Sequence, residues 1–373
     1  RPLGGMLFGH LGDTFGRKPV LVVSVLMMGA CTVAIGLLPT YAEIGAAAGI
    51  VLVGLRVLQG ISVGGEFTGS AVFIAEHAPT ARRGFYSSWV ICGSFGGFLV
   101  GSAVASAVTT FASDAAVNEF WWRVPFLAGV LIMIAAFLLR RSVEEPEAEA
   151  EDAVEAEEEA AARAEESGVA GSPVVHALRH HWRAIMRVFG LALAVNVGYY
   201  MMFVYAVSYL TEEMHVSTAA AMDINTLCLV LIVIVPLLSA LFSDRFGRKT
   251  VLVSGLLGMI VLSWPLFWLM HHDDLVMIFL GQAGFALVFG WIYGANPATM
   301  VEILPRSVRV SALSIGYNGA LALFGGTTPL VATYLLQRTG DDFAPVWYLI
   351  ALSVVSLAVA LSIPETARRP LRE

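Results

Sequence analysis

Two similar stretches of sequence, 231 residues apart, decide the fold of this chain. Residues 12–26 read GDTFGRKPVLVVSVL, and residues 243–257 read SDRFGRKTVLVSGLL. A second match follows at nearly the same offset, because Glu76-x-x-Pro79-x-x-x-Arg83 returns 226 residues later as Glu302-x-x-Pro305-x-x-x-Arg309. Two matches at almost constant spacing indicate an internal repeat. The sequence therefore predicts two similar halves.

The composition places both halves in a membrane. Of the 373 residues, 57% are hydrophobic and 14% are charged, against roughly 25% charged residues in ordinary soluble proteins. A soluble domain of this size could not bury so much apolar surface. This excludes a cytosolic enzyme, a disordered protein and a disulfide-rich secreted module. Cys31, Cys92 and Cys228 lie far apart in apolar runs, so we interpret them as helix-packing residues.

Ten apolar runs approach or exceed the roughly 20 residues that a membrane-spanning helix needs. They cover residues 20–38, 46–75, 85–111, 121–139, 184–210, 221–242, 250–270, 275–300, 310–336 and 343–363. Residues 1–11 are predicted to be the second half of another span, cut off at its start. Restoring the missing part gives six plus six helices. Since both repeat copies fall on the same side, the two halves are parallel.

Basic residues predict the orientation of the chain. They cluster in alternate loops, whereas the opposite loops are acidic except for Arg338. By the positive-inside rule, the basic side and the C-terminus are cytoplasmic. One cytoplasmic stretch is strongly acidic, with twelve acids and one base between Glu144 and Glu166. The predicted organisation is an N-terminal membrane half at 1–139, an acidic solvated linker at 140–183, a C-terminal membrane half at 184–363 and a cytoplasmic tail at 364–373.

The repeated D-x-F-G-R-K loop suits a cytoplasmic gate. Its glycine permits a tight turn, and its basic residues suit the lipid headgroup region. Asp13 and Asp244 end the preceding helices, where a carboxylate is unfavourable beside the negative end of the helix dipole. We expect each to pair with a cation, Arg83 or Arg309. The alternative is that these loops carry only orientation charge. The predicted gate residues are Asp13, Gly16, Arg17, Lys18, Glu76, Arg83, Asp244, Arg245, Gly247, Arg248, Lys249, Glu302 and Arg309.

The span at 46–75 carries two charged residues, Arg56 and Glu66, and charges inside a span are costly and usually functional. Together with Gln59, Ser62 and Ser70 they occupy about a third of the helix circumference. We hypothesise that Arg56 attracts a substrate carboxylate and that Glu66 carries the coupled proton. The alternative is a structural network with neighbouring helices. The glycines at 60, 64 and 65 indicate close helix packing.

The span at 184–210 presents Asn196, Tyr199, Tyr200 and Phe203 on one face. Aromatic rings around a quaternary ammonium give cation–π attraction, although ordinary helix packing would also account for this face. Tyr317 and Asn318 are weaker candidates. The predicted substrate-binding residues are Arg56, Gln59, Ser62, Asn196, Tyr199, Tyr200, Phe203, Tyr317 and Asn318.

Other chemistry finds little support in the sequence. The run from His271 to Asp274 lies on an outer loop without a partner cluster, so we predict no metal site. The sequence contains no P-loop, nucleophile elbow or HExxH motif. Enzymatic activity, a cofactor and a nucleic-acid partner are therefore not predicted.

These residues resemble the major facilitator superfamily, and within it the bacterial metabolite:proton symporters. The resemblance covers essentially the whole chain, and its most diagnostic stretch is Arg56-x-x-Gln59-Gly60-x-Ser62-x-Gly64-Gly65-Glu66. Among members, the chain is most similar to the proline/glycine betaine transporters, through Glu66-Phe67-Thr68-Gly69, Asn196-x-x-Tyr199-Tyr200 and Glu365-Thr366-Ala367-x-Arg369-Pro370-Leu371. Leu304-Pro305 departs from the more usual Phe-Pro. The sequence given contains no coiled-coil tail of the kind found in some osmosensing members, so tail-dependent osmotic gating is not among the expectations.

The resemblance implies an all-α membrane protein with the major facilitator fold. It implies a monomeric symporter in the inner membrane of a bacterium, which imports a small zwitterionic osmoprotectant with protons by alternating access. The first alternative is a carboxylate:proton symporter for 2-oxoglutarate, citrate or shikimate. A dianion should require more than one deep base, and Arg56 is the only one at depth. The second alternative is a non-transporting sensor or scaffold, which would gain nothing from buried Arg and Glu.

Overall fold

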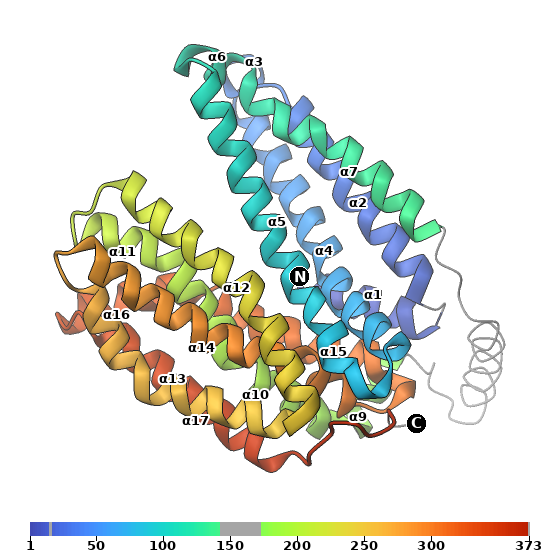
Figure 1. Ribbon diagram of the computed structural model, residues 1–373. Coiled ribbons are helices and arrows are strands. Elements are labelled where there is room, and N and C mark those ends of the chain that lie inside the picture. The colour runs from blue at the N-terminus through green and yellow to red at the C-terminus, as the bar shows by residue number, and fades with distance from the viewer. Residues whose placement is uncertain (15–16, 142–172, 372–373) are drawn as a thin grey trace. The chain divides into compact units, whose positions relative to one another are not determined.

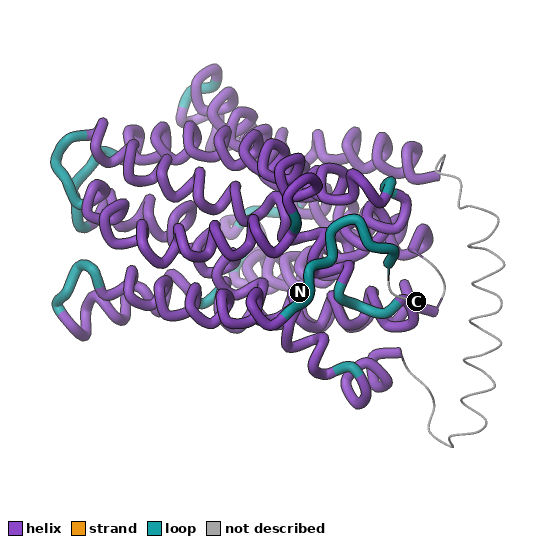
Figure 2. The backbone as a smooth tube through the Cα atoms, turned by 60° about the horizontal axis from the view of Figure 1, so that its bottom comes forward, coloured by secondary structure: helices purple, strands orange, loops and turns teal. Residues whose placement is uncertain are grey.

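The computed structural model describes residues 1–14, 17–141 and 173–371. Within these residues every regular element is a helix, and strands are absent (Figure 2). Ten of the described helical segments are long and apolar enough to cross a membrane. Each overlaps one of the ten predicted runs, which confirms the all-α membrane class.

The chain forms two compact units, and the first comprises Arg1–Ser70, Val100–Trp182 and Ser307–Ile315. Within it, α2 packs along α7, and α1 contacts α2 and α9 (Figure 1). Its elements are α1 (Pro2–Thr14), α2 (Arg17–Leu37), α3 (Tyr41–Ile44), most of α4 (Ala46–His77), the end of α5 (Arg83–Phe111), α6 (Asp114–Glu119), η2 (Trp121–Arg123), α7 (Val124–Arg141), α9 (Pro173–His180), most of η4 (Arg306–Val308) and the start of α15 (Arg309–Ala320).

Small residues let α1 and α4 approach closely in the first unit. A Cβ atom added to Gly64 would overlap Arg1 and would lie 2.8 Å from the backbone nitrogen of Gly5. A Cβ on Gly65 would overlap the side chain of Phe8. The predicted packing role of these two glycines is confirmed, whereas Gly60 has only an ordinary contact at 3.7 Å.

The second unit comprises Ala71–Leu99, Arg183–Arg306 and Gly316–Glu373. Within it, α12 and α13 pack on α14, and α17 packs along α13 and α16 (Figure 1). Its elements are the end of α4, η1 (Thr80–Arg82), most of α5, α10 (Trp182–Tyr199), the π-helix η3 (Tyr200–Tyr205), α11 (Ala206–Glu212), α12 (Thr218–Phe246), α13 (Arg248–Met270), α14 (Leu275–Glu302), the end of α15, the π-helix η5 (Leu321–Gly325), α16 (Thr328–Thr339) and α17 (Ala344–Ser362).

Helix α14 carries several buried polar side chains through the core of the second unit. Buried polar groups are costly unless they are hydrogen-bonded. Asn296 Nδ2 donates to the carbonyl oxygen of Leu191 at 3.1 Å, and the Thr299 hydroxyl donates to that of Ala295 at 2.7 Å. Tyr293 donates to the carbonyl oxygen of Val195 at 3.2 Å. Two of these bonds fix α14 against α10.

At one end of the second unit, α11 is attached to the end of α13. The Tyr209 hydroxyl lies 2.6 Å from His271 Nδ1. His271 Nε2 lies 3.5 Å from Asp342 Oδ2. The histidine that begins the His271–Asp274 run therefore joins three segments of the chain.

The predicted division of the chain at residues 140–183 stays a prediction. Most of that linker, residues 142–172 with the acidic run, lies outside the described residues. Each compact unit contains residues from both sides of the linker.

Candidate functional site

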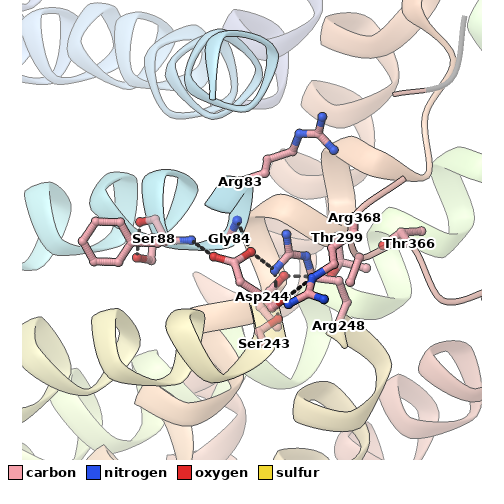
Figure 3. A network of polar contacts seen from close by, with 12 residues as sticks. Arg83, Gly84, Ser88, Ser243, Asp244, Arg248, Thr299, Thr366 and Arg368 are labelled. Atoms are coloured by element: carbon pink, nitrogen blue, oxygen red, sulfur yellow. Dashed lines mark hydrogen bonds and ion pairs between the residues drawn. The ribbon is translucent and has the colours of Figure 1, made fainter. Parts of the chain in front are cut away.

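Four buried charged side chains in the second unit form one cluster, which we call the ion cluster: Arg83, Asp244, Arg248 and Glu302. Figure 3 labels Arg83, Asp244 and Arg248 of this cluster. Arg248 pairs with Asp244 Oδ1 at 2.8 Å and with Glu302 Oε1 at 3.1 Å. Arg83 reaches Glu302 Oε1 at 3.4 Å. Two positive charges thus face two negative charges. This balance is what burial requires, since an unpaired buried charge is strongly destabilising.

Asp244 joins the end of α12 to the beginning of α5 (Figure 3). Its carboxylate accepts hydrogen bonds from the backbone nitrogens of Gly84 and Phe85, both at 2.9 Å. These are free donors at the positive end of the α5 dipole, where a carboxylate is favourable. A Cβ on Gly84 would overlap the Arg248 guanidinium and lie 2.8 Å from Asp244 Oδ1. Glycine is therefore required where α5 meets this carboxylate.

The structure adds ion pairs that the sequence did not predict. Asp244 pairs with Arg248 of the following helix, and Arg83 pairs with Glu302. The pairing of Asp244 with Arg309 stays a prediction. The placement of Arg248 in the headgroup region was wrong, because its side chain is only 1% exposed. The sequence missed this because loop arginines ordinarily serve as orientation charges.

The predicted tight turn at Gly247 is confirmed. Its φ of 107° lies in the region that side-chain-bearing residues rarely adopt. The flanking Arg245 is exposed and lies over the Phe246 ring at 5.4 Å. In the other repeat copy, Gly16 lies outside the described residues and the side chains of Asp13, Arg17 and Lys18 are not described. Their roles stay predictions.

Residues 363–371, which follow the last span, are tied to the ion cluster, and we call them the C-terminal strap. The Thr366 hydroxyl donates to Glu302 Oε2 at 2.6 Å, and Arg368 Nε donates to the Asp244 carbonyl oxygen at 3.0 Å. Arg83 donates to the carbonyl oxygen of Arg369 at 3.0 Å. Sequence reasoning missed these contacts, because their partners lie 64, 124 and 286 residues apart in the sequence.

Glu365 of the C-terminal strap caps the N-terminus of α13. Its two carboxylate oxygens accept hydrogen bonds from the backbone nitrogens of Arg248 at 2.9 Å and Lys249 at 3.0 Å. Helix N-termini leave such donors unsatisfied, and a carboxylate there also complements the helix dipole. Glu365 therefore holds the strap against the turn that begins α13.

Replacing Glu365 with glutamine should destabilise the protein by about 1–2 kcal/mol, because a neutral amide offers one acceptor in place of two and no charge. Thermal unfolding of the purified protein in detergent measures the effect. The matched control is Glu212→Gln at an exposed position, which should unfold like the wild type. Equal midpoints for all three proteins would contradict the capping role.

Some of the polar side chains predicted on α4 are buried in the first unit, and others are accessible. Gln59 and Ser62 are buried; Gln59 Nε2 donates to Thr32 Oγ1 at 2.8 Å, and Ser62 donates to the carbonyl oxygen of Ser24. Both bonds fasten α4 to α2. Arg56 is exposed, and its Nη1 donates to Gln59 Oε1 at 3.3 Å. Glu66 is half-buried. The substrate and proton roles of these residues stay predictions.

The predicted aromatic face of α10 meets rings from two other helices in the second unit. The Tyr199 ring lies 5.3 Å from Phe95 and 5.8 Å from Phe203, centroid to centroid. Phe95 of α5 in turn lies 5.6 Å from Tyr293 of α14. We call Phe95, Tyr199, Phe203 and Tyr293 the ring cluster. Phe95 and Tyr293 were not predicted, because a single sequence carries no signal that brings separate helices together.

This aromatic face continues into the π-helix η3. A π-helical turn is wider than an α-helical one, and such turns are frequent at functional sites. Gln282 Nε2 of α14 donates to the carbonyl oxygen of Met202 inside η3 at 2.8 Å, and to Asn225 Oδ1 at 2.8 Å. A buried side chain of α14 thus supports the irregular turn.

The second π-helix, η5, lies beside the same face. A Cβ on Gly325 would lie 3.2 Å from Asn196 Cβ and 3.2 Å from Tyr200 Cδ2. Segment α16, which follows η5, also contacts η3. Tyr317 and Asn318 are buried ahead of η5. Both π-helices therefore converge on Asn196 and Tyr200.

The fold defines a multi-pass helical membrane protein with buried ion pairs. The sequence model of the Major Facilitator Superfamily matches residues 3–315 and 188–373. The chain belongs to this superfamily, as the resemblance in its sequence indicated.

Named relatives match over the whole chain. The glycine betaine/proline/ectoine/pipecolic acid transporter OusA of Dickeya dadantii is 35% identical over 372 residues, which is 100% of this chain and 74% of the relative. The proline/betaine transporter of Escherichia coli K12 is 34% identical over 377 residues, with the same coverage. The ectoine/proline transporter ProP of Corynebacterium glutamicum is also 34% identical, over 386 residues.

Solved structures share the fold. The proton:xylose symporter XylE bound to 6-bromo-6-deoxy-D-glucose superposes with a TM-score of 0.78 at 20% identity, over 99% of this chain and 85% of that chain. An inward-open XylE structure from E. coli gives a TM-score of 0.61, over 98% of this chain and 84% of that chain. At this identity the likeness shows a common fold.

Proposed function

We propose that this protein is a proton-coupled symporter that imports a small zwitterion, proline or glycine betaine, by alternating access. The observation that carries the proposal is the 34–35% identity over the whole chain to transporters named for these compounds. The fold it shares with a proton symporter supports the coupling to protons. We place the protein as a monomer in the inner membrane of a bacterium, with the basic loops and the C-terminal strap on the cytoplasmic side.

In this proposal Arg56 binds the substrate carboxylate and Glu66 carries the proton. Arg56 is accessible, and Gln59 orients its guanidinium without neutralising it. Arg123, another arginine of the first unit, is engaged with the carbonyl oxygens of Gly36 at 2.8 Å and Leu38 at 2.6 Å. Since those bonds cap the end of α2, Arg123 is not a second ligand for a dianion. This favours a zwitterion over the carboxylate alternative.

The ion cluster serves as part of the cytoplasmic gate in this proposal. Its side chains connect the beginning of α5 with α12, α13 and α14. Opening this end of the protein requires Asp244 to release the first backbone amides of α5. Breaking paired buried charges is costly, so the ion cluster stabilises the closed arrangement of this end.

Uptake by the purified protein in proteoliposomes tests the proposal. Labelled proline, glycine betaine, 2-oxoglutarate and shikimate are supplied with and without an inward proton gradient. We expect accumulation of proline or glycine betaine only with the gradient. Accumulation of 2-oxoglutarate or shikimate instead would establish the carboxylate alternative, and no uptake of any compound would favour a sensor or scaffold.

Replacing Arg56 with glutamine should weaken substrate binding by about 10- to 100-fold, because a charge-assisted hydrogen bond to the carboxylate is lost. Equilibrium binding of labelled substrate in detergent measures the change. The control is Arg338→Gln, an exposed arginine on α16, which should bind like the wild type. Unchanged affinity in the Arg56→Gln protein would leave that arginine with a structural role only.

A further inference from the structure

Asn196 is a buried amide with an unused donor at the meeting point of the two π-helices. Its side chain is 3% exposed, and its Nδ2 has no hydrogen-bond partner among the described residues. A buried donor without a partner is costly, and native proteins rarely keep one unless it serves a purpose. The donor therefore points to an acceptor that arrives with a ligand.

The accessible surface next to Asn196 is aromatic. Tyr199 and Tyr200 are half-buried, whereas Phe95 and Tyr293 are each 5% exposed. Tyr293 uses its hydroxyl to donate to the Val195 carbonyl oxygen, which fixes its ring in place. Because Tyr199 and Tyr200 follow Asn196 at i+3 and i+4, the Cβ atom of each tyrosine lies about 5–6 Å from that of Asn196. The short distance between the amide and the rings matches a small molecule whose anionic and cationic groups are separated by one or two carbons.

We propose that Asn196 and the ring cluster form a subsite that selects N-methylated zwitterions, such as betaines, over unmethylated ones. Asn196 Nδ2 donates to the substrate carboxylate, and the ring cluster receives the quaternary ammonium. The proposal rests on the proposed function and specifies the substrate class of that transporter.

The chemistry of the two cations explains the selectivity. A quaternary ammonium has no N–H group, so it loses no hydrogen bond when aromatic faces surround it, and the ring quadrupoles attract its charge. The secondary ammonium of proline keeps two N–H donors that need acceptors. Ring faces are poor acceptors, so proline loses more hydrogen bonding than a betaine when it is placed against them. The carboxylate is common to both substrates, so Asn196 should serve both equally.

The experiment measures competition by glycine betaine and by proline for uptake in proteoliposomes, for the wild type and four variants. Phe95→Leu should weaken the affinity for glycine betaine by about 5- to 20-fold and the affinity for proline by less than about 2-fold. Phe95→Trp keeps an aromatic face and should retain the wild-type ratio. Asn196→Ala should weaken both compounds by about the same factor, near 10-fold. Phe285→Leu removes a buried ring from the same unit outside the ring cluster, and should leave the ratio unchanged.

Two results would overturn the inference: a Phe95→Leu protein whose affinities for both substrates fall by the same factor, or one whose two affinities are unchanged. The proline affinity of the Phe95→Leu protein is its internal folding control, because a misfolded protein could not keep proline binding while losing glycine betaine. A retained ratio in Phe95→Trp would show that position 95 tolerates a larger aromatic ring. A wild-type protein that transports neither compound would overturn the proposed function itself, which separates the two failures.

Discussion

Replacing Glu302 with glutamine should destabilise the protein by about 3–5 kcal/mol, because it leaves buried positive charge without compensation. Glu302 is 4% exposed and receives Arg248 Nε at 3.2 Å and Arg248 Nη2 at 3.1 Å. It also accepts from Arg83 at 3.4 Å and from the Thr366 hydroxyl at 2.6 Å. With a neutral amide at this position, Asp244 would be the one remaining carboxylate of the ion cluster against two guanidinium groups. Chemical unfolding in detergent, followed by tryptophan fluorescence, measures the loss.

A second substitution separates the charge from the packing. If the destabilisation comes from unbalanced charge, the Arg83→Gln change should restore part of the stability in the Glu302→Gln background while destabilising the wild type. The coupling free energy from this double-mutant cycle should then be well above the error of the measurement. Additive effects of the two changes would contradict a charge-balanced ion cluster.

Replacing Glu66 with glutamine should abolish uphill accumulation of substrate while sparing exchange of bound substrate across the membrane. The amide cannot release a proton, so it removes the coupling, but it keeps a similar volume and polarity on α4. Proton-driven accumulation and counterflow in the same proteoliposomes measure the two activities separately. Loss of both activities would assign Glu66 a structural or substrate-binding role.

The control for this experiment is Glu119→Gln, at an exposed position at the end of α6, which should accumulate substrate normally. Normal accumulation by the Glu66→Gln protein would exclude Glu66 as the coupling residue. The proton would then have to be carried by another group.

The membrane helices could be predicted because their signal is local. A lipid-exposed span must be apolar over its whole length and must satisfy its own backbone hydrogen bonds. The runs at 121–139 and 275–300 therefore give helices in the structure at Trp121–Leu139 and Leu275–Glu302. The π-helices could not be predicted in this way, because Tyr200–Tyr205 is as apolar as its α-helical neighbours and one wide turn leaves no mark on composition.

The candidate site was predictable only where its residues share one helix face. Helical spacing alone groups Asn196 with Tyr199 and Tyr200. Two partners of Arg248 are different, since Glu302 lies 54 residues away and the Glu365 cap lies 117 residues away. Such pairs depend on how helices pack, and a single sequence does not encode them in any spacing. For the same reason Phe95 and Tyr293 were missed.

The π-helix at Tyr200–Tyr205 also sets the rotational phase of the helix that follows it. A wide turn accommodates about one residue more than an α-helical turn, and one residue corresponds to about 100° of rotation and 1.5 Å of rise. Because the wide turn takes up this extra residue, the helix after it is out of step by one residue with an α-helix counted onward from Asn196. Helical spacing counted through residues 200–205 as if they were α-helical would therefore misplace the face of α11 by about 100°. The contact of Tyr209 with His271 at 2.6 Å depends on this offset, which hydrophobicity does not reveal.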